Sequence, residues 1–134
     1  MPPRAKATKT AFAGVHAQLK SILQKYEGGL LKVQSDEPGR YILLLPASEK
    51  TKQRDIWFGA VITGKNYVSF HFTPVYALPE LASMLSPELK KRMQGKSCFN
   101  FKDQVDDLLL KQVIALTDKG HKGFMRTFEE GQFR

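Results

Sequence analysis

The sequence contains one cysteine and no long apolar run, and each shortage excludes a class of protein. The single cysteine, Cys98, excludes an internal disulfide and a zinc site built only from cysteines. The longest apolar stretch, YILLLP at 41–46, is far shorter than the roughly 20 residues of a membrane-spanning helix. The basic N-terminus is not followed by the continuous apolar run of a secretory signal. We therefore expect no membrane segment and a reducing, cytoplasmic location.

The sequence also lacks the common signatures of catalysis. G-x-S-x-G and G-x-G-x-x-G do not occur. GKS at 95–97 matches the end of a phosphate-binding P-loop, but Lys90 stands where that motif requires its first glycine. Cys98 lies between aromatic and polar neighbours on a short apolar stretch, and we interpret it as a small buried hydrophobe. No residue is therefore predicted to be catalytic, and the sequence leaves the question of an enzyme open.

What the chain does contain is an excess of positive charge. Its 134 residues are 42% hydrophobic and carry a net charge of +8, which is typical of one globular domain. The first 26 residues hold five basic side chains and no acidic one. A second basic cluster consists of Lys90, Lys91, Arg92 and Lys96. Such a balance suits nucleic acid, anionic membranes or acidic proteins as partners, although many basic domains bind none of these.

Apolar spacing predicts the order of secondary structure. We expect a flexible basic arm at 1–8 and a single domain at 9–134, whose first helix ends at Gly28. Four strands are predicted in succession, at 30–35, 40–45, 55–63 and 67–72. A short helix from Ser86, a brief strand at 97–101 and a second long helix, capped by Asp103 and ended by Gly120, then follow.

This order predicts an α+β fold, a two-layer sandwich. The four successive strands favour an antiparallel meander sheet, because neighbours in such a sheet can be joined by short turns. The N-terminal and C-terminal helices would pack on one face of that sheet. The other face would remain open to solvent or to a partner.

The segment KNYVSFHF, at 65–72, has three possible interpretations. Lys65, Tyr67 and Phe72 fit an RNA-binding strand, but Ser69 stands where another stacking ring is expected, and the predicted element order does not fit that fold. His71 could be a metal ligand, but no motif with metal-ligand spacing accompanies it. The third interpretation, sheet core, is the preferred one. Alternation places Val68, Phe70 and Phe72 under the helices, and Tyr67, Ser69 and His71 on the open face.

The neighbouring segment DIWFGAVIT, at 55–63, gives a less clear pattern. Strict alternation would place Ile56, Phe58, Ala60 and Ile62 on one face, and Trp57, Gly59, Val61 and Thr63 on the other. A tryptophan on the open face would be a candidate anchor for a ligand or partner. The alternative, which the sequence favours, is that Trp57 packs under the C-terminal tail.

Two segments and the leucine-rich helix after them carry a family resemblance that covers roughly residues 12 to 124. The segments are NYVSFHFTPVY and SPELKKRMQGKSCFNF, and the most specific part is GKSCFNF with the following lysine. On these residues the chain resembles the YdhG-like family of uncharacterised bacterial domains. The resemblance implies a frataxin-like fold and, through that fold, iron handling or iron–sulfur assembly. The chain departs from that pattern, since the first helix carries lysines where an acidic ridge would hold iron. No iron-binding residue is therefore assigned.

Three functions follow from the sequence, in order of preference. The first is a non-enzymatic binding or interaction domain that uses the open sheet face, and self-association through that face would be one way to cover it. The residues predicted for this face are Trp57, Lys65, Tyr67, Ser69 and His71. The second is an iron or iron–sulfur accessory protein, with iron implied by the resemblance alone. The third and weakest is nucleic-acid binding through the cluster of Lys90, Lys91, Arg92 and Lys96 and the N-terminal arm.

Overall fold

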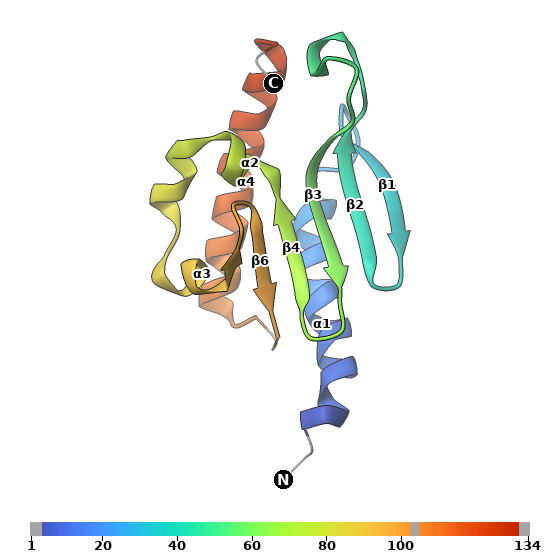
Figure 1. Cartoon of the computed structure of the whole chain (residues 1–134), viewed down its shortest axis with the longest axis vertical. Helices are drawn as coiled ribbons and strands as arrows, with labels where there is room; N and C mark the ends of the chain where they lie inside the picture. Colours follow the sequence, from blue (N-terminus) through green and yellow to red (C-terminus); the bar gives the residue numbers. More distant parts are fainter. Residues whose placement is uncertain (1–3, 103–104, 132–134) are drawn as a thin grey trace.

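The computed structural model describes residues 4–102 and 105–131, with side chains from Phe12 onwards. Its centre is a six-stranded antiparallel sheet in the order β1-β2-β3-β4-β6-β5 (Figure 1). The strands are β1 (Lys32–Glu37), β2 (Arg40–Leu45), β3 (Ile56–Thr63), β4 (Val68–Phe72), β5 (Met93–Gln94) and β6 (Cys98–Phe101). The first four strands form the predicted meander, and the hairpin of β5 and β6 extends it beyond β4.

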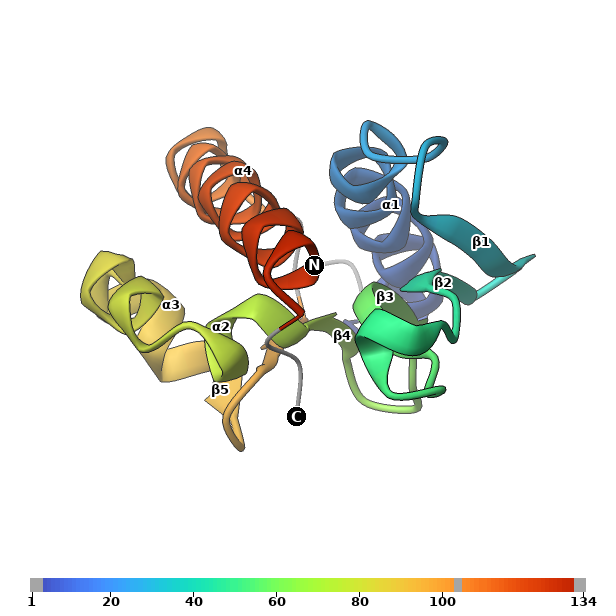
Figure 2. The same cartoon turned by 90° about the horizontal axis from the view of Figure 1, so that it is seen from above.

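Two long helices cover one face of this sheet. These are α1 (Arg4–Gln24) and α4 (Asp107–Glu129), and Figure 2 shows both on the same side. Shorter helices connect the strands: η1 (Glu49–Thr51), α2 (Thr73–Ala77), η2 (Pro79–Met84) and α3 (Pro87–Arg92). The predicted two-layer α+β sandwich is therefore confirmed. Within the described residues, no helix is long and apolar enough to cross a membrane.

The first helix has one apolar face, which packs on the sheet. Val15, Leu19 and Leu23 are fully buried against the sheet, as their spacing of four residues requires. The helix begins at Arg4, inside the segment predicted as a flexible arm. Gly28 and Gly29 lie just beyond its end with φ of 91° and 59°, a conformation that glycine adopts without steric cost. The chain can therefore reverse direction and enter the sheet.

The last helix differs from the prediction at both ends. Its N-cap is Asp106, whose side chain accepts a hydrogen bond of 2.8 Å from the backbone N–H of Leu109. Asp103, the predicted cap, lies outside the described residues and three positions too early. Leu108, an apolar residue in the first turn of this helix, is 70% exposed. The helix also continues through Gly120 as far as Glu129, so that the predicted end at Gly120 was wrong.

The core lies between the two helices and the sheet. As predicted, Val68, Phe70 and Phe72 of β4 are buried on the face that the helices cover. Phe58 lies among the aromatic residues of this core. Phe99 and Phe101 of β6 continue the same buried layer towards the edge of the sheet.

A β-bulge in β3 changes the predicted faces of that strand. Leu43 pairs with Gly59, but the next residue of β2, Leu44, pairs with Trp57, so Phe58 is the extra residue. Phe58 and Val61 consequently both belong to the core under the helices. A smaller cluster on the opposite face contains Ile42, Leu44 and Ala60, with Trp57 and Ile62 packed against it. The alternation predicted for β3 therefore fails after Phe58.

Candidate functional site

The face of the sheet away from α1 and α4, called the open face below, carries most of the residues predicted for it. Ser69 pairs with Ile62, and His71 pairs with Ala60, so both side chains point away from the helices. Trp57 lies on the same face, with its ring centroid 6.1 Å from that of His71 and nearly perpendicular to it. Trp57 packs against the cluster around Ile42 on this face. Its packing under the C-terminal tail stays a prediction, because residues 132–134 of that tail lie outside the described residues.

Lys65 is not part of this group. It lies in the turn between β3 and β4 and lines a separate hollow of about 510 Å³ with Phe12 and His16. His16, almost fully buried beside this hollow, is within 3.2 Å of the hydroxyl of Thr63 through its Nδ1 atom. The structure therefore separates Lys65 from the tryptophan, serine and histidine with which the sequence grouped it.

A chain of hydrogen bonds runs across the open face from β4 to β5. The hydroxyl of Ser69 donates to Oδ1 of Asn100 at 2.9 Å, and Nδ2 of Asn100 donates to Oε1 of Gln94 at 2.7 Å. The hydroxyl of Tyr67 donates to the same Oε1 atom at 3.3 Å. The network therefore fixes the positions of two carboxamides that were not predicted as site residues.

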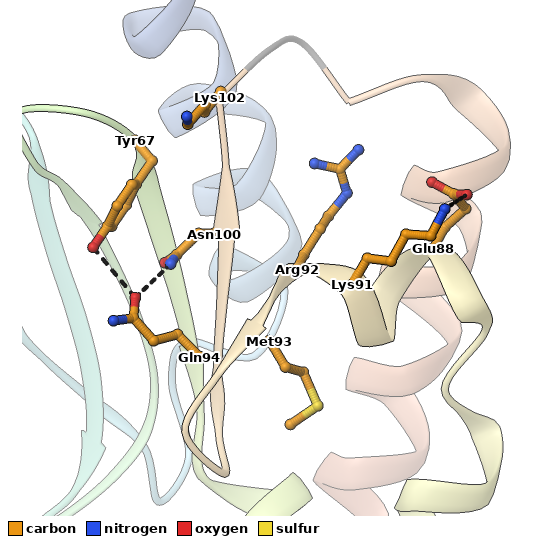
Figure 3. Close-up of a pocket in the computed structure, with 8 residues that line it drawn as sticks. All are labelled: Tyr67, Glu88, Lys91, Arg92, Met93, Gln94, Asn100 and Lys102. Atoms are coloured by element: carbon orange, nitrogen blue, oxygen red, sulfur yellow. Dashed lines mark hydrogen bonds and ion pairs between the residues drawn. The ribbon is translucent and has the colours of Figure 1, made fainter.

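The basic end of α3 lies beside this network, and the two together form a groove of about 580 Å³. Figure 3 shows the polar residues of the sheet on one side of β6 and the basic residues of α3 on the other. The residues lining the groove are Tyr67, Glu88, Lys91, Arg92, Met93, Gln94, Asn100 and Lys102. This groove, called the α3 groove below, joins one residue predicted for the sheet face to two from the predicted basic cluster.

The positive charges of the α3 groove are only partly neutralised. Lys91 lies 3.6 Å from Glu88, but both side chains are largely exposed, and such pairs contribute little to stability. Arg92 has no ion pair with any described residue, and its buried Nε atom has no hydrogen-bond partner there. Its guanidinium group lies 5.2 Å from the ring centroid of Phe101. Lys102 is likewise without an ion pair among the described residues.

The predicted basic cluster does not form one continuous surface. Lys91 and Arg92 line the α3 groove, whereas Lys90 and Lys96 line a second hollow of about 520 Å³. Met93 contributes to both, so the two hollows are neighbours. The sequence identified these four basic residues but could not show how they divide between the two hollows.

Cys98 and His71 lie together on the open face, with 4.0 Å between Sγ and Nε2. Burial raises the pKa of the Cys98 thiol, and a hydrogen bond with Ser69 opposes this only in part. Burial also lowers the pKa of His71. At neutral pH the pair is therefore a thiol and a neutral imidazole, whereas an activated cysteine nucleophile needs thiolate character.

The lowered pKa of His71 predicts a specific dependence of stability on pH. Because its folded-state pKa lies below the unfolded value, its neutral form stabilises the fold above the unfolded pKa of about 6.5, and this contribution is lost as the pH falls through the folded pKa. We expect urea denaturation to show a smaller loss of stability from about pH 7.5 to pH 5.5 for His71→Gln than for the unchanged protein. Equal losses of stability in the two proteins would show that His71 does not contribute to this pH dependence.

The site implied by the resemblance to iron-handling proteins does not fit the described residues. No group of three or more histidine, cysteine, aspartate or glutamate side chains in 4–102 and 105–131 is placed to hold a metal ion. Asp36, near the end of β1, forms an ion pair with Lys20 of α1. Asp106 is engaged as a helix cap. We therefore derive no iron chemistry from this chain.

Comparisons of the chain with protein families, with curated proteins and with solved structures found no match. The relationship to YdhG-like proteins and the frataxin-like topology therefore stay predictions, and the site must be interpreted from its own geometry.

Proposed function

We propose that this chain is a non-enzymatic binding domain whose α3 groove takes an anion rich in oxygen atoms, such as a phosphate or carboxylate group. The observation that carries the proposal is Arg92, a guanidinium group at the groove without a carboxylate partner among the described residues. Guanidinium groups bind carboxylate and phosphate oxygens through paired N–H donors. Lys102 supplies a second unpaired cation at the same groove.

The carboxamides of the groove support the same ligand chemistry. Oε1 of Gln94 already accepts hydrogen bonds from Asn100 and Tyr67, so that its Nε2 atom is the end available to a ligand. Oδ1 of Asn100 is likewise occupied, by the hydroxyl of Ser69. These amide orientations follow from the hydrogen-bond network. The groove therefore offers mainly N–H donors and cations, which complement a ligand whose polar atoms are acceptors.

The proposal keeps the interaction domain predicted from the sequence but places its binding surface at the α3 groove instead of around Trp57 and His71. Self-association through the open face stays a separate prediction, which a measurement of oligomeric state would test. Iron handling is not included in the proposal, since the described residues do not provide its ligand set.

The test is the affinity for tripolyphosphate, measured by titration calorimetry at low salt. We expect Arg92→Gln to weaken binding at least about tenfold, because hydrogen bonds to charged groups contribute about 1.5–3 kcal/mol. Lys102→Gln should weaken it in the same direction without removing the contact between Arg92 and Phe101. Arg126→Gln, an exposed position on α4, removes the same charge and is the matched control. Absence of binding to the unchanged protein, or equal losses in Arg92→Gln and Arg126→Gln, would contradict the proposal.

A further inference from the structure

The second hollow, which shares Met93 with the α3 groove, also combines an aromatic ring with positive charge. It contains Lys90 and Lys96, together with Tyr76, a residue that is 62% exposed. Nζ of Lys96 lies 5.5 Å from the ring centroid of Tyr76. The α3 groove likewise combines a tyrosine, Tyr67, with cationic side chains. Two neighbouring hollows therefore each present an aromatic ring beside positive charge.

Each hollow presents an aromatic ring and positive charge. Two such hollows in succession suit a polymer in which planar groups alternate with anionic groups. We propose that single-stranded nucleic acid occupies both hollows, with its backbone passing over Met93, the residue that follows α3 and begins β5. This inference rests on the proposed anion-binding function and names the ligand class. Exposed aromatic rings stack on unpaired bases, and lysine and arginine side chains neutralise the phosphates between them. The hydrogen bond from Tyr67 to Gln94 helps to hold the first ring in place.

The same features favour a single strand over other polyanions. The bases of a duplex are stacked on each other, so tyrosine rings at the surface cannot reach their faces. An acidic peptide would satisfy Arg92, Lys102, Lys90 and Lys96, but it supplies no regular series of planar groups for Tyr67 and Tyr76. The cations alone would serve either polymer, and the two tyrosines distinguish them.

The inference is tested by fluorescence anisotropy with a labelled oligothymidylate of about 12 nucleotides and its oligouridylate counterpart. At about 50 mM salt we expect at least one of them to bind more tightly than thymidine monophosphate. The logarithm of its affinity should fall with the logarithm of salt concentration, with a slope of about −0.7 for each phosphate contacted. Tyr76→Ala should weaken binding about fivefold to a hundredfold, as loss of one stacked base predicts, and Tyr76→Phe should restore it.

Two further measurements separate this inference from the anion-binding proposal. Lys96→Gln should weaken oligonucleotide binding and leave tripolyphosphate binding in the α3 groove unchanged, whereas Lys119→Gln, exposed on α4, should alter neither. If the oligonucleotides bind no more tightly than the monophosphate, or no more tightly than a duplex or polyglutamate, the inference is overturned while the anion-binding proposal stands. An unchanged affinity in Tyr76→Ala would overturn it as well. Absence of binding to both tripolyphosphate and oligonucleotide would overturn both proposals.

Discussion

Replacing Phe58 by alanine is expected to lower the free energy of unfolding by about 3–5 kcal/mol, the usual cost of deleting a fully buried aromatic side chain. Phe58 is 0% exposed and touches rings from three other parts of the chain. Its ring centroid lies 5.3 Å from those of Phe72 and Phe124, 5.6 Å from that of His121 and 5.7 Å from that of Tyr26. Alanine would leave a cavity where β3, β4, α4 and the end of α1 meet.

The matched control for this prediction is the preceding residue. Trp57 is on the opposite face of the same strand and is only half-buried, so Trp57→Ala should cost less even though it removes a larger side chain. Urea denaturation of both variants measures the difference. A loss in Phe58→Ala no greater than that in Trp57→Ala would show that the bulge does not turn Phe58 towards the helices.

The position of Phe58 also shows where prediction from the sequence reaches its limit. Alternation assigns a face correctly only while each residue has one partner, as in β4, where Val68, Phe70 and Phe72 were predicted correctly. In β3 the extra residue shifts every later side chain to the opposite face. The bulge arises from pairing with β2, so β3 taken alone cannot reveal it. Gly59, next to the bulge, lies close to α1: a Cβ atom there would be 2.6 Å from Cδ2 of Leu23.

The sequence identified some residues of the α3 groove, but not that they lie together. Tyr67 was identified from the alternation of its strand, and Lys91 and Arg92 from their charge. Gln94 was missed because β5 has two residues, which is too short to produce a periodic pattern. Asn100 carried a usable signal, since it alternates with Phe99 and Phe101 and must therefore point to the open face. What joins these parts is the β5–β6 hairpin, which places the end of α3 beside the sheet.

Substituting alanine for Gly120 is expected to destabilise the protein by about 2–3 kcal/mol, although alanine is intrinsically the better helix former by about 1 kcal/mol. A Cβ atom at this position would lie 2.5 Å from Cε2 of Phe72 and 3.0 Å from Cβ of Pro74. Phe72 cannot easily move, because its ring is fully buried against those of Phe58 and Phe70. Close packing of α4 against Phe72 and Pro74 therefore explains why a glycine stands inside this helix.

Gly14 of α1 provides the matched control, because a Cβ atom there would have no heavy atom within 4 Å. Gly14→Ala should therefore leave stability unchanged or raise it by up to about 1 kcal/mol, through helix propensity and the lower entropy of the unfolded chain. Both variants gain the same helix propensity, so any difference between them comes from packing. In thermal denaturation, the midpoint of Gly120→Ala should fall, whereas that of Gly14→Ala should rise or stay unchanged. If Gly120→Ala were as stable as Gly14→Ala, α4 would have to lie farther from Phe72 than the structure places it. Close packing would then no longer explain why a glycine stands inside α4.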